Sequence, residues 1–253
     1  MISTSQKLFL VLYSSDPSRR PWLSYQHLRL LTPSLSYDGA RSLVHFYKLK
    51  GLIRTEKVKY QARFTLTVQG GRHLERLLPV FSPRWRKWQG QVSMLVFLDA
   101  PGRDPGFRYL AGLLNQAGSI RLARGVYLYP GSFPDTIVNE CQTSYLLSVV
   151  VFQIKEFLVG EIRNKIVSDS QAREIIKGYQ EISNKLDQLL ESKLSFGQRS
   201  DQTKQTICSL FDRFSSLVKT DIGACRHYFP QVVSPDQLLE KLQRLIGNLQ
   251  AIG

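Results

Sequence analysis

The amino-acid sequence predicts an α+β fold in three successive parts. Positive charge is concentrated in the first part: residues 1–90 hold 16 Lys/Arg against 4 Asp/Glu, a net charge of +12, whereas residues 91–253 carry +2. The apolar pattern also changes twice, from helices with a hairpin, to strands and helices, to long helical stripes. These changes predict domains at 1–80, 91–165 and 166–253, with a linker at 81–90.

The N-terminal part is predicted to contain helices followed by a β-hairpin. Its predicted elements are helices over 6–13, 25–31 and 37–50, strands over 52–55 and 62–67, and a short helix carrying Leu74, Leu77 and Leu78. Ser36 is suited to cap the third helix, and Gly51 stands where a helix commonly ends. Helices followed by a two-stranded ribbon with a basic tip are the order of a winged helix-turn-helix domain.

The central part is predicted to be an α/β sandwich of the ferredoxin-like kind. Its predicted elements are a strand over 92–98, a helix over 107–117 and strands over 120–129 and 145–157. The last part is predicted to be a helical domain, with apolar stripes within 175–190, 210–218 and 238–249. We expect these stripes to form a core, and a dimer seam is the alternative.

Several runs of sequence resemble known DNA-binding proteins. The run KLKGLIRT…RFTLTVQGGRHLERL resembles winged-helix transcription factors. The linker WRKWQGQVSMLVFLD, the stretch LLNQAGSIRLARGVYLYPG and the tail LFDRFSSLVKTDIGACRHYFPQVVSPDQLLEKLQRL extend a resemblance to PaaX-type repressors of phenylacetate catabolism over nearly the whole chain. The central part is also similar to the small ferredoxin-like subunits of CRISPR spacer integration.

This resemblance implies the three-part architecture and DNA binding. It does not imply the phenylacetyl-CoA ligand, because FPQVV stands where the PaaX-type family usually has a Pro-rich turn.

The third helix and the hairpin supply the candidate DNA-binding residues. With Leu43, Val44 and Tyr47 turned inward, the opposite face of the helix carries Arg41, Ser42, His45 and Lys48. A helix of this length fits the major groove, where Arg can bridge two acceptors of guanine. The candidates on or near the hairpin are Lys57, Lys59, Tyr60 and Arg63. The alternatives are that these charges are only solvated, and that Arg41 pairs with Asp38 one turn earlier.

The sequence predicts no catalytic or metal site. Cys141, Cys208 and Cys225 are odd in number and contain no C-x-x-C pair, and the four His lack metal-ligand spacing. Asp99, at the end of a predicted strand, is the strongest catalytic candidate, because in the spacer-integration subunits an Asp at that position has been linked to metal-dependent nuclease activity. A single carboxylate is weak support, since hard cations are usually held by several oxygens. A structural Asp that caps the next turn is the alternative.

The sequence therefore predicts a cytoplasmic DNA-binding transcriptional regulator, a repressor that occupies an operator as a homodimer. Its predicted partners are double-stranded DNA, a second copy of the chain and an unidentified small-molecule effector, with no cofactor. No membrane association is expected, because no segment approaches 18 unbroken apolar residues. Two alternatives remain: a metal-dependent nuclease that uses Asp99, and a nucleic-acid-binding scaffold subunit that acts through protein partners.

Overall fold

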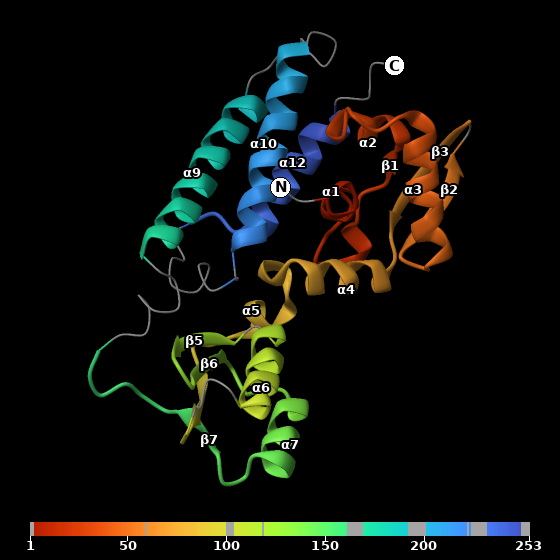
Figure 1. The fold of residues 1–253 in the computed structure, drawn as a ribbon. Helices are drawn as coiled ribbons and strands as arrows, with labels where there is room; N and C mark the ends of the chain where they lie inside the picture. The colour runs from red at the N-terminus through yellow and green to blue at the C-terminus, as the bar shows by residue number, and fades with distance from the viewer. Residues whose placement is uncertain are drawn as a thin grey trace. The chain divides into compact units, whose positions relative to one another are not determined.

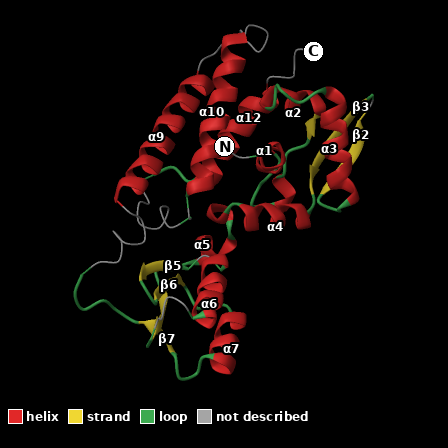
Figure 2. Ribbon diagram, viewed as in Figure 1, coloured by secondary structure: helices red, strands yellow, loops and turns green. Residues whose placement is uncertain are grey.

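The computed structural model describes residues 3–58, 60–99, 104–117, 119–160, 169–191, 201–221, 223 and 232–248. These residues form a mixed α/β protein with two antiparallel sheets and a helical C-terminal region (Figure 1), and the secondary structure is coloured in Figure 2. The chain divides into two compact units. Unit 1 comprises Met1–Ser82 together with Arg173–Gly253, and unit 2 comprises Pro83–Ala172.

The N-terminal part of unit 1 has the predicted order of helices and hairpin. Its elements are α1 (Thr4–Val11), β1 (Leu23–Ser24), α2 (Tyr25–Leu31), α3 (Tyr37–Leu49), β2 (Ile53–Val58), β3 (Gln61–Leu66) and α4 (Val68–Leu77). The short strand β1 was not predicted, and it pairs with β3 to give an antiparallel sheet of order β1-β3-β2. Short 3-10 turns at Pro17–Arg19 and Pro79–Phe81 complete this part.

The C-terminal helices complete the core of unit 1. They are α9 (Asp169–Glu191), α10 (Asp201–Thr220) and α12 (Pro235–Asn248). Their apolar stripes are buried within the single chain, with Leu186, Phe214 and Leu242 each 0% exposed. The stripes thus form a core, as expected first. The sequence predicted a separate helical domain here, whereas these helices belong to the same compact unit as the N-terminal elements.

Polar contacts also join the C-terminal helices to the N-terminal part. The Cys208 thiol of α10 donates to the carbonyl of Leu30 at 3.1 Å. On α12, the Gln243 amide nitrogen donates to the carbonyls of Val11 at 2.9 Å and Tyr13 at 2.7 Å. The Val11 carbonyl, which α1 itself leaves without a partner, and the Tyr13 carbonyl just after the helix are thus satisfied by a residue far along the chain.

Unit 2 is a four-stranded antiparallel sheet with two main helices on one face. Its elements are α5 (Pro83–Lys87), β4 (Val92–Phe97), α6 (Pro105–Gln116), β5 (Ile120–Ala123), β6 (Val126–Pro130), α7 (Asp135–Ser144) and β7 (Val149–Ile154), with sheet order β5-β6-β4-β7. The core lies between this face and the helices, where Leu95 and Tyr127 pack with Leu110, Leu114 and Ile137.

Two features of unit 2 differ from the sequence prediction. The strand expected over 120–129 is two strands, because Gly125 has a φ of +76° and turns the chain between β5 and β6. Helix α7 was not predicted, and it occupies the stretch before β7, so that β7 begins at Val149 rather than at Tyr145.

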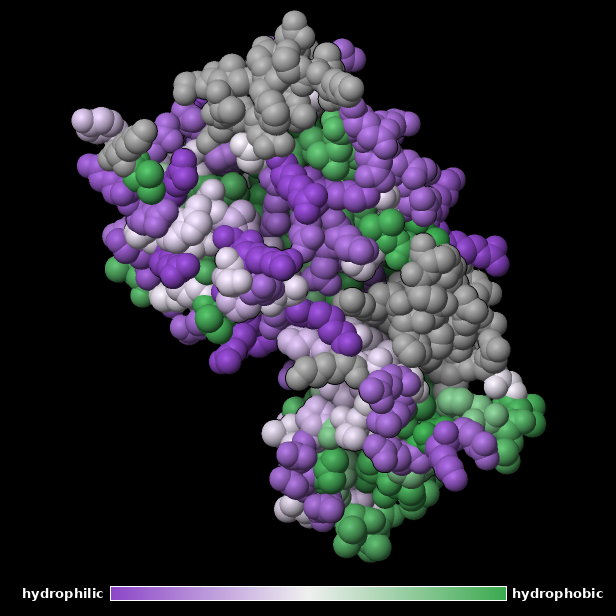
Figure 3. Space-filling model, turned by 180° about the vertical axis from the view of Figure 1, so that it is seen from behind, coloured by the Kyte–Doolittle hydropathy of each residue, from purple (hydrophilic) through white to green (hydrophobic). Residues whose placement is uncertain are grey.

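Unit 2 also exposes many apolar side chains. Besides Leu98 and Tyr109, they lie before β7, on it and after it: Leu146, Leu147, Val150, Phe152, Phe157, Leu158 and Val159. Apolar surface is drawn in green in Figure 3. Strand β7 is an edge strand, so its outer backbone groups are not used in the sheet. No helix in the described part of the chain is long and apolar enough to cross a membrane.

Candidate nucleic-acid interface

Helix α3 (Tyr37–Leu49) begins at the predicted residue and ends one residue earlier than predicted. The Ser36 hydroxyl accepts from the Gly39 amide at 3.0 Å, which caps the first turn. Asp38 lies in the first turn and Lys48 in the last, where each complements the helix dipole. Gly51 has a φ of +69° directly after the helix, a conformation that glycine adopts without a steric penalty.

The two faces of α3 differ as predicted. Ala40 and Val44 are buried, and Tyr47 packs edge-on against Phe9 of α1 with ring centroids 4.8 Å apart. The opposite face exposes the four predicted residues, Arg41, Ser42, His45 and Lys48. Within the described residues no ion pair joins Arg41 to Asp38, so the structural alternative for Arg41 is not observed.

The β2–β3 hairpin places its polar residues in a defined register. Glu56 is opposite Arg63, Lys57 is opposite Ala62 and Val58 is opposite Gln61. Tyr60 at the tip is 97% exposed, which is unusual for an aromatic ring and leaves it free to contact a partner. Lys59, also predicted as a binding residue, lies outside the described residues.

A groove of about 440 Å³ separates α3 from the hairpin. Four of the predicted residues line it together: His45 and Lys48 from α3, and Lys57 and Tyr60 from the hairpin. The remaining lining residues are Tyr25, Val44, Thr55, Glu56 and Ala62. Arg41, Ser42 and Arg63 are exposed outside this lining. The groove therefore brings two basic side chains, an imidazole and an exposed phenol to one place.

Sequence reasoning missed two tyrosines beside this groove. Tyr25 lines the groove and a second hollow of about 130 Å³, which Tyr37 and Tyr60 also line. The Tyr25 and Tyr37 rings meet edge-on at 5.6 Å. Burial raises the pKa of Tyr25, and the nearby Arg41 guanidinium partly opposes that rise. Both tyrosines stand at the first position of a helix, which alone does not indicate a surface role.

Some of the basic residues in the N-terminal third have structural roles. The buried Arg20 donates to the carbonyl of Thr67, and burial lowers the pKa of its guanidinium. In the linker, Arg84 donates to the Ala117 carbonyl at 2.7 Å and to the Tyr129 hydroxyl at 3.2 Å. Neither of these two cations is free for a phosphate.

Asp99 stands apart from other possible metal ligands among the described residues. Asp99 is exposed just after β4, and residues 100–103 lie outside the described chain. Asp104 caps α6, with Oδ1 accepting from the Gly106 amide at 2.7 Å. Among the described residues, no group of three His, Cys, Asp or Glu side chains is placed to hold a metal ion.

No protein-family model and no curated protein matches this chain. Among solved structures it is similar to the uncharacterized protein Rv0674 from Mycobacterium tuberculosis, with 13% sequence identity, a TM-score of 0.45, and coverage of 98% of this chain and 94% of that one.

Proposed function

We propose that the protein is a DNA-binding transcriptional regulator, a repressor that occupies an operator as a homodimer. The observation that carries the proposal is the groove between α3 and the hairpin. There His45, Lys48, Lys57 and Tyr60 line one space, with the exposed Arg41 and Ser42 on the same helix. Exposed cations that are free to neutralise phosphates are the main source of protein–DNA affinity.

The order of elements supports the architecture that this function would use. Helices α1, α2 and α3 followed by the β2–β3 hairpin and α4 are the order of a winged helix-turn-helix domain. In unit 2, the order β4-α6-β5-β6-α7-β7 with sheet order β5-β6-β4-β7 is that of a ferredoxin-like fold. Both agree with the resemblance to PaaX-type repressors.

In the proposed complex, α3 lies in the major groove and the hairpin follows the DNA backbone. Arg41, Ser42, His45 and Lys48 face the base edges, where bidentate Arg contacts discriminate guanine. Lys57 and Tyr60 project from the hairpin toward the sugar–phosphate backbone. Repression then follows from occupancy of the operator.

The exposed apolar surface of unit 2 supports pairing of two copies. Helix-turn-helix proteins usually read two half-sites one helical turn apart, so their domains have to be held in pairs. The side chains of Val150 and Phe152 on the edge strand β7 are 43% and 42% exposed.

Light scattering on the purified chain should give twice the mass of one copy. A monomer at all accessible concentrations would remove the homodimer from the proposal.

Two substitutions test the DNA interface after an operator has been selected from genomic fragments. Lys57→Gln should weaken binding to operator and random duplex about equally. It should also lower the magnitude of the negative slope of log K against log salt by about one, because one fewer counterion is released. Arg41→Ala should weaken operator binding more than random binding, by about tenfold or more, because base contacts carry the specificity. Fluorescence anisotropy over a salt series measures both.

The matched control is Lys177→Gln on α9. This exposed lysine lies near Glu181. Its substitution removes the same charge as Lys57→Gln, but away from the groove. Its salt slope should equal that of the unmodified protein. A Lys57→Gln slope that matches the control, or equal losses for Arg41→Ala on both duplexes, would remove that residue from the interface. Affinity that does not change with salt would contradict the proposal as a whole.

A further inference from the structure

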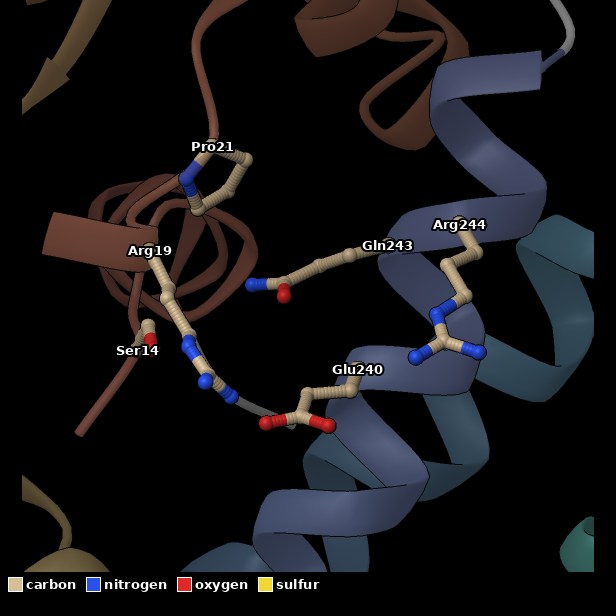
Figure 4. A pocket seen from close by; sticks show the side chains of 6 residues that line it. All are labelled: Ser14, Arg19, Pro21, Glu240, Gln243 and Arg244. Carbon is tan, nitrogen blue, oxygen red and sulfur yellow. The ribbon is translucent and has the colours of Figure 1, made fainter. Parts of the chain in front are cut away.

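Besides the groove and the hollow beside it, unit 1 has a polar cavity among residues that the proposed DNA interface does not use. Its volume is about 300 Å³, at the lower end of the range of small-molecule sites. It is lined by Ser14, Arg19, Pro21, Glu240, Gln243 and Arg244. Figure 4 shows the side chains of the 14–21 segment and those of α12 converging on this space from two sides.

One wall of the cavity is held rigidly. The amide nitrogen of Gln243 donates to the carbonyls of Val11 and Tyr13, at 2.9 and 2.7 Å, so both of its hydrogens are used. Those bonds fix the carboxamide, and no hydrogen bond to its Oε1 is found within the described chain. The Ser14 hydroxyl oxygen accepts from the Asp16 amide at 3.3 Å, which leaves its proton available. A fixed acceptor, the Gln243 Oε1, and an available donor, the Ser14 hydroxyl, therefore line the same space.

Within the described chain, the three charged groups that line the cavity form no ion pair with one another. Arg19 contacts Asp16 through Nε at 3.4 Å, which leaves the outer nitrogens of its guanidinium unused in that contact. Glu240 forms no ion pair within 4 Å with Arg19 or with Arg244 in the part of the chain that the structure describes. Two guanidinium groups and one carboxylate thus line the cavity, and among the described residues no ion pair between them spans it.

The charges of the cavity balance when Asp16 is included. Arg19 and Arg244 line it with positive charge and Glu240 with negative charge, and Asp16, which pairs with Arg19 without lining the cavity, offsets the remaining positive charge. A simple ion of either sign therefore meets repulsion as well as attraction there. A ligand that has both charges matches it better. An anionic group would bind the guanidinium groups and the Ser14 hydroxyl, and an ammonium group would bind the Glu240 carboxylate and the Gln243 Oε1.

We infer that this cavity is a binding site for a small zwitterion, a molecule with one anionic group and one ammonium group a few bonds apart. The anionic group is a carboxylate or a phosphate, and the choice of probe distinguishes the two. The site lies between the segment that leads into β1 and the last described helix, and it does not depend on whether the protein binds DNA.

The test measures binding of defined probes to the full chain by NMR. β-Alanine presents a carboxylate with an ammonium group, and O-phosphoethanolamine presents a phosphate with an ammonium group. Ethanolamine and inorganic phosphate each present only half of that pair. The side-chain amide signals of Gln243 in ¹⁵N-labelled protein report occupancy of the cavity. At least one zwitterion should give a saturable shift at lower concentration than either half-probe, and the one that binds more tightly identifies the anionic group.

Single substitutions locate the site. Glu240→Gln and Arg244→Gln each remove one charged partner from an exposed position, so folding should be preserved. Each should weaken the zwitterion by about tenfold or more, as expected for the loss of a charge-assisted hydrogen bond. Arg213→Gln on α10, a surface arginine paired with Glu181 away from the cavity, should leave the affinity unchanged.

Three results would overturn the inference. The first is the absence of a saturable Gln243 shift with either zwitterion at tens of millimolar. The second is an affinity that the Glu240 and Arg244 substitutions leave unchanged. The third is binding of inorganic phosphate as tight as that of O-phosphoethanolamine, since this would describe a simple anion site. None of these results bears on the DNA proposal, whose readout is binding to duplex DNA.

Discussion

At the scale of single residues, burial separates side chains that look alike in the sequence. Lys48 and Lys57 border an open groove, whereas Arg20 is buried and bonded to a backbone carbonyl. Arg84 is likewise committed to Ala117 and Tyr129. The net charge of the first ninety residues therefore overstates the number of cations that a polyanion could meet. The sequence could not make this distinction, because arginine occurs in both settings, exposed at Arg41 and buried at Arg20.

His27 is a buried titratable residue with a predictable effect on stability. Its Nδ1 accepts from the Ser24 amide at 3.0 Å, so the ring is neutral in the folded chain. Burial lowers its pKa to about 4, the nearby backbone of Gly247 partly offsets this, and Arg63 adds to it. The unfolded chain, with a pKa near 6.5, binds the proton more readily.

The stability contributed by a neutral His27 is present above about pH 6.5 and is lost as the pH falls toward 4. The free energy of unfolding should drop by about 3 kcal/mol over that window on account of this residue. Denaturant titrations at several pH values measure it. In His27→Gln the decline over the same window should be shallower, and an identical slope in both proteins would contradict this account.

At the scale of elements, local patterns predicted what close-range chemistry determines. Helix α2 lies at the predicted residues, and α3 ends one residue earlier than predicted, because caps and apolar spacing act within a few residues. The two errors in unit 2 have different causes. Gly125 turns the chain and divides one expected strand into β5 and β6. Helix α7 was not predicted because its apolar stripe is weak, with only Ile137 and Cys141 buried.

Helix α4 approaches the base of the hairpin so closely that a glycine is required. A Cβ on Gly70 would lie 2.1 Å from the carbonyl oxygen of Leu52, which cannot move without displacing backbone. Gly70→Ala should lower the free energy of unfolding by about 2 kcal/mol or more, despite the better helix propensity of Ala. Chemical denaturation of unit 1 measures this loss.

Gly112 in the interior of α6 is the matched control. A Cβ there meets no atom within 4 Å, so Gly112→Ala should stabilise unit 2 by about 0.5–1 kcal/mol. Equal effects of the two substitutions would show that close approach at Gly70 is not what constrains α4.

At the scale of the whole molecule, the C-terminal helices and the N-terminal elements share one core. The side chain of Leu8 on α1 is 0% exposed, as are those of Phe211 on α10 and Leu245 on α12. Bonds from Cys208 and Gln243 join the two ends of the chain. The N-terminal part therefore depends on residues beyond position 200 to bury its apolar face.

A chain that ends at residue 168 tests this dependence and lacks α9, α10 and α12. We expect the backbone amides of α1, such as those of Leu10 and Val11, to lose protection from hydrogen exchange, because their covering helices are absent. The amides of Leu95 and Phe97 in unit 2 should keep their protection and serve as the internal reference. Continued protection of α1 would show that the N-terminal part folds without the C-terminal helices.

The sequence by itself determined the order of most helices and strands, the two faces of α3 and the concentration of positive charge near one end. These properties follow from neighbouring residues, whose spacing is read directly along the chain. Only the tertiary structure decided which cations are buried, that the last helices complete the first unit, and which side chains meet in the groove and in the charge-balanced cavity. Such pairings depend on contacts between segments as distant as Gln243 and Val11, 232 positions apart, and no local spacing records them.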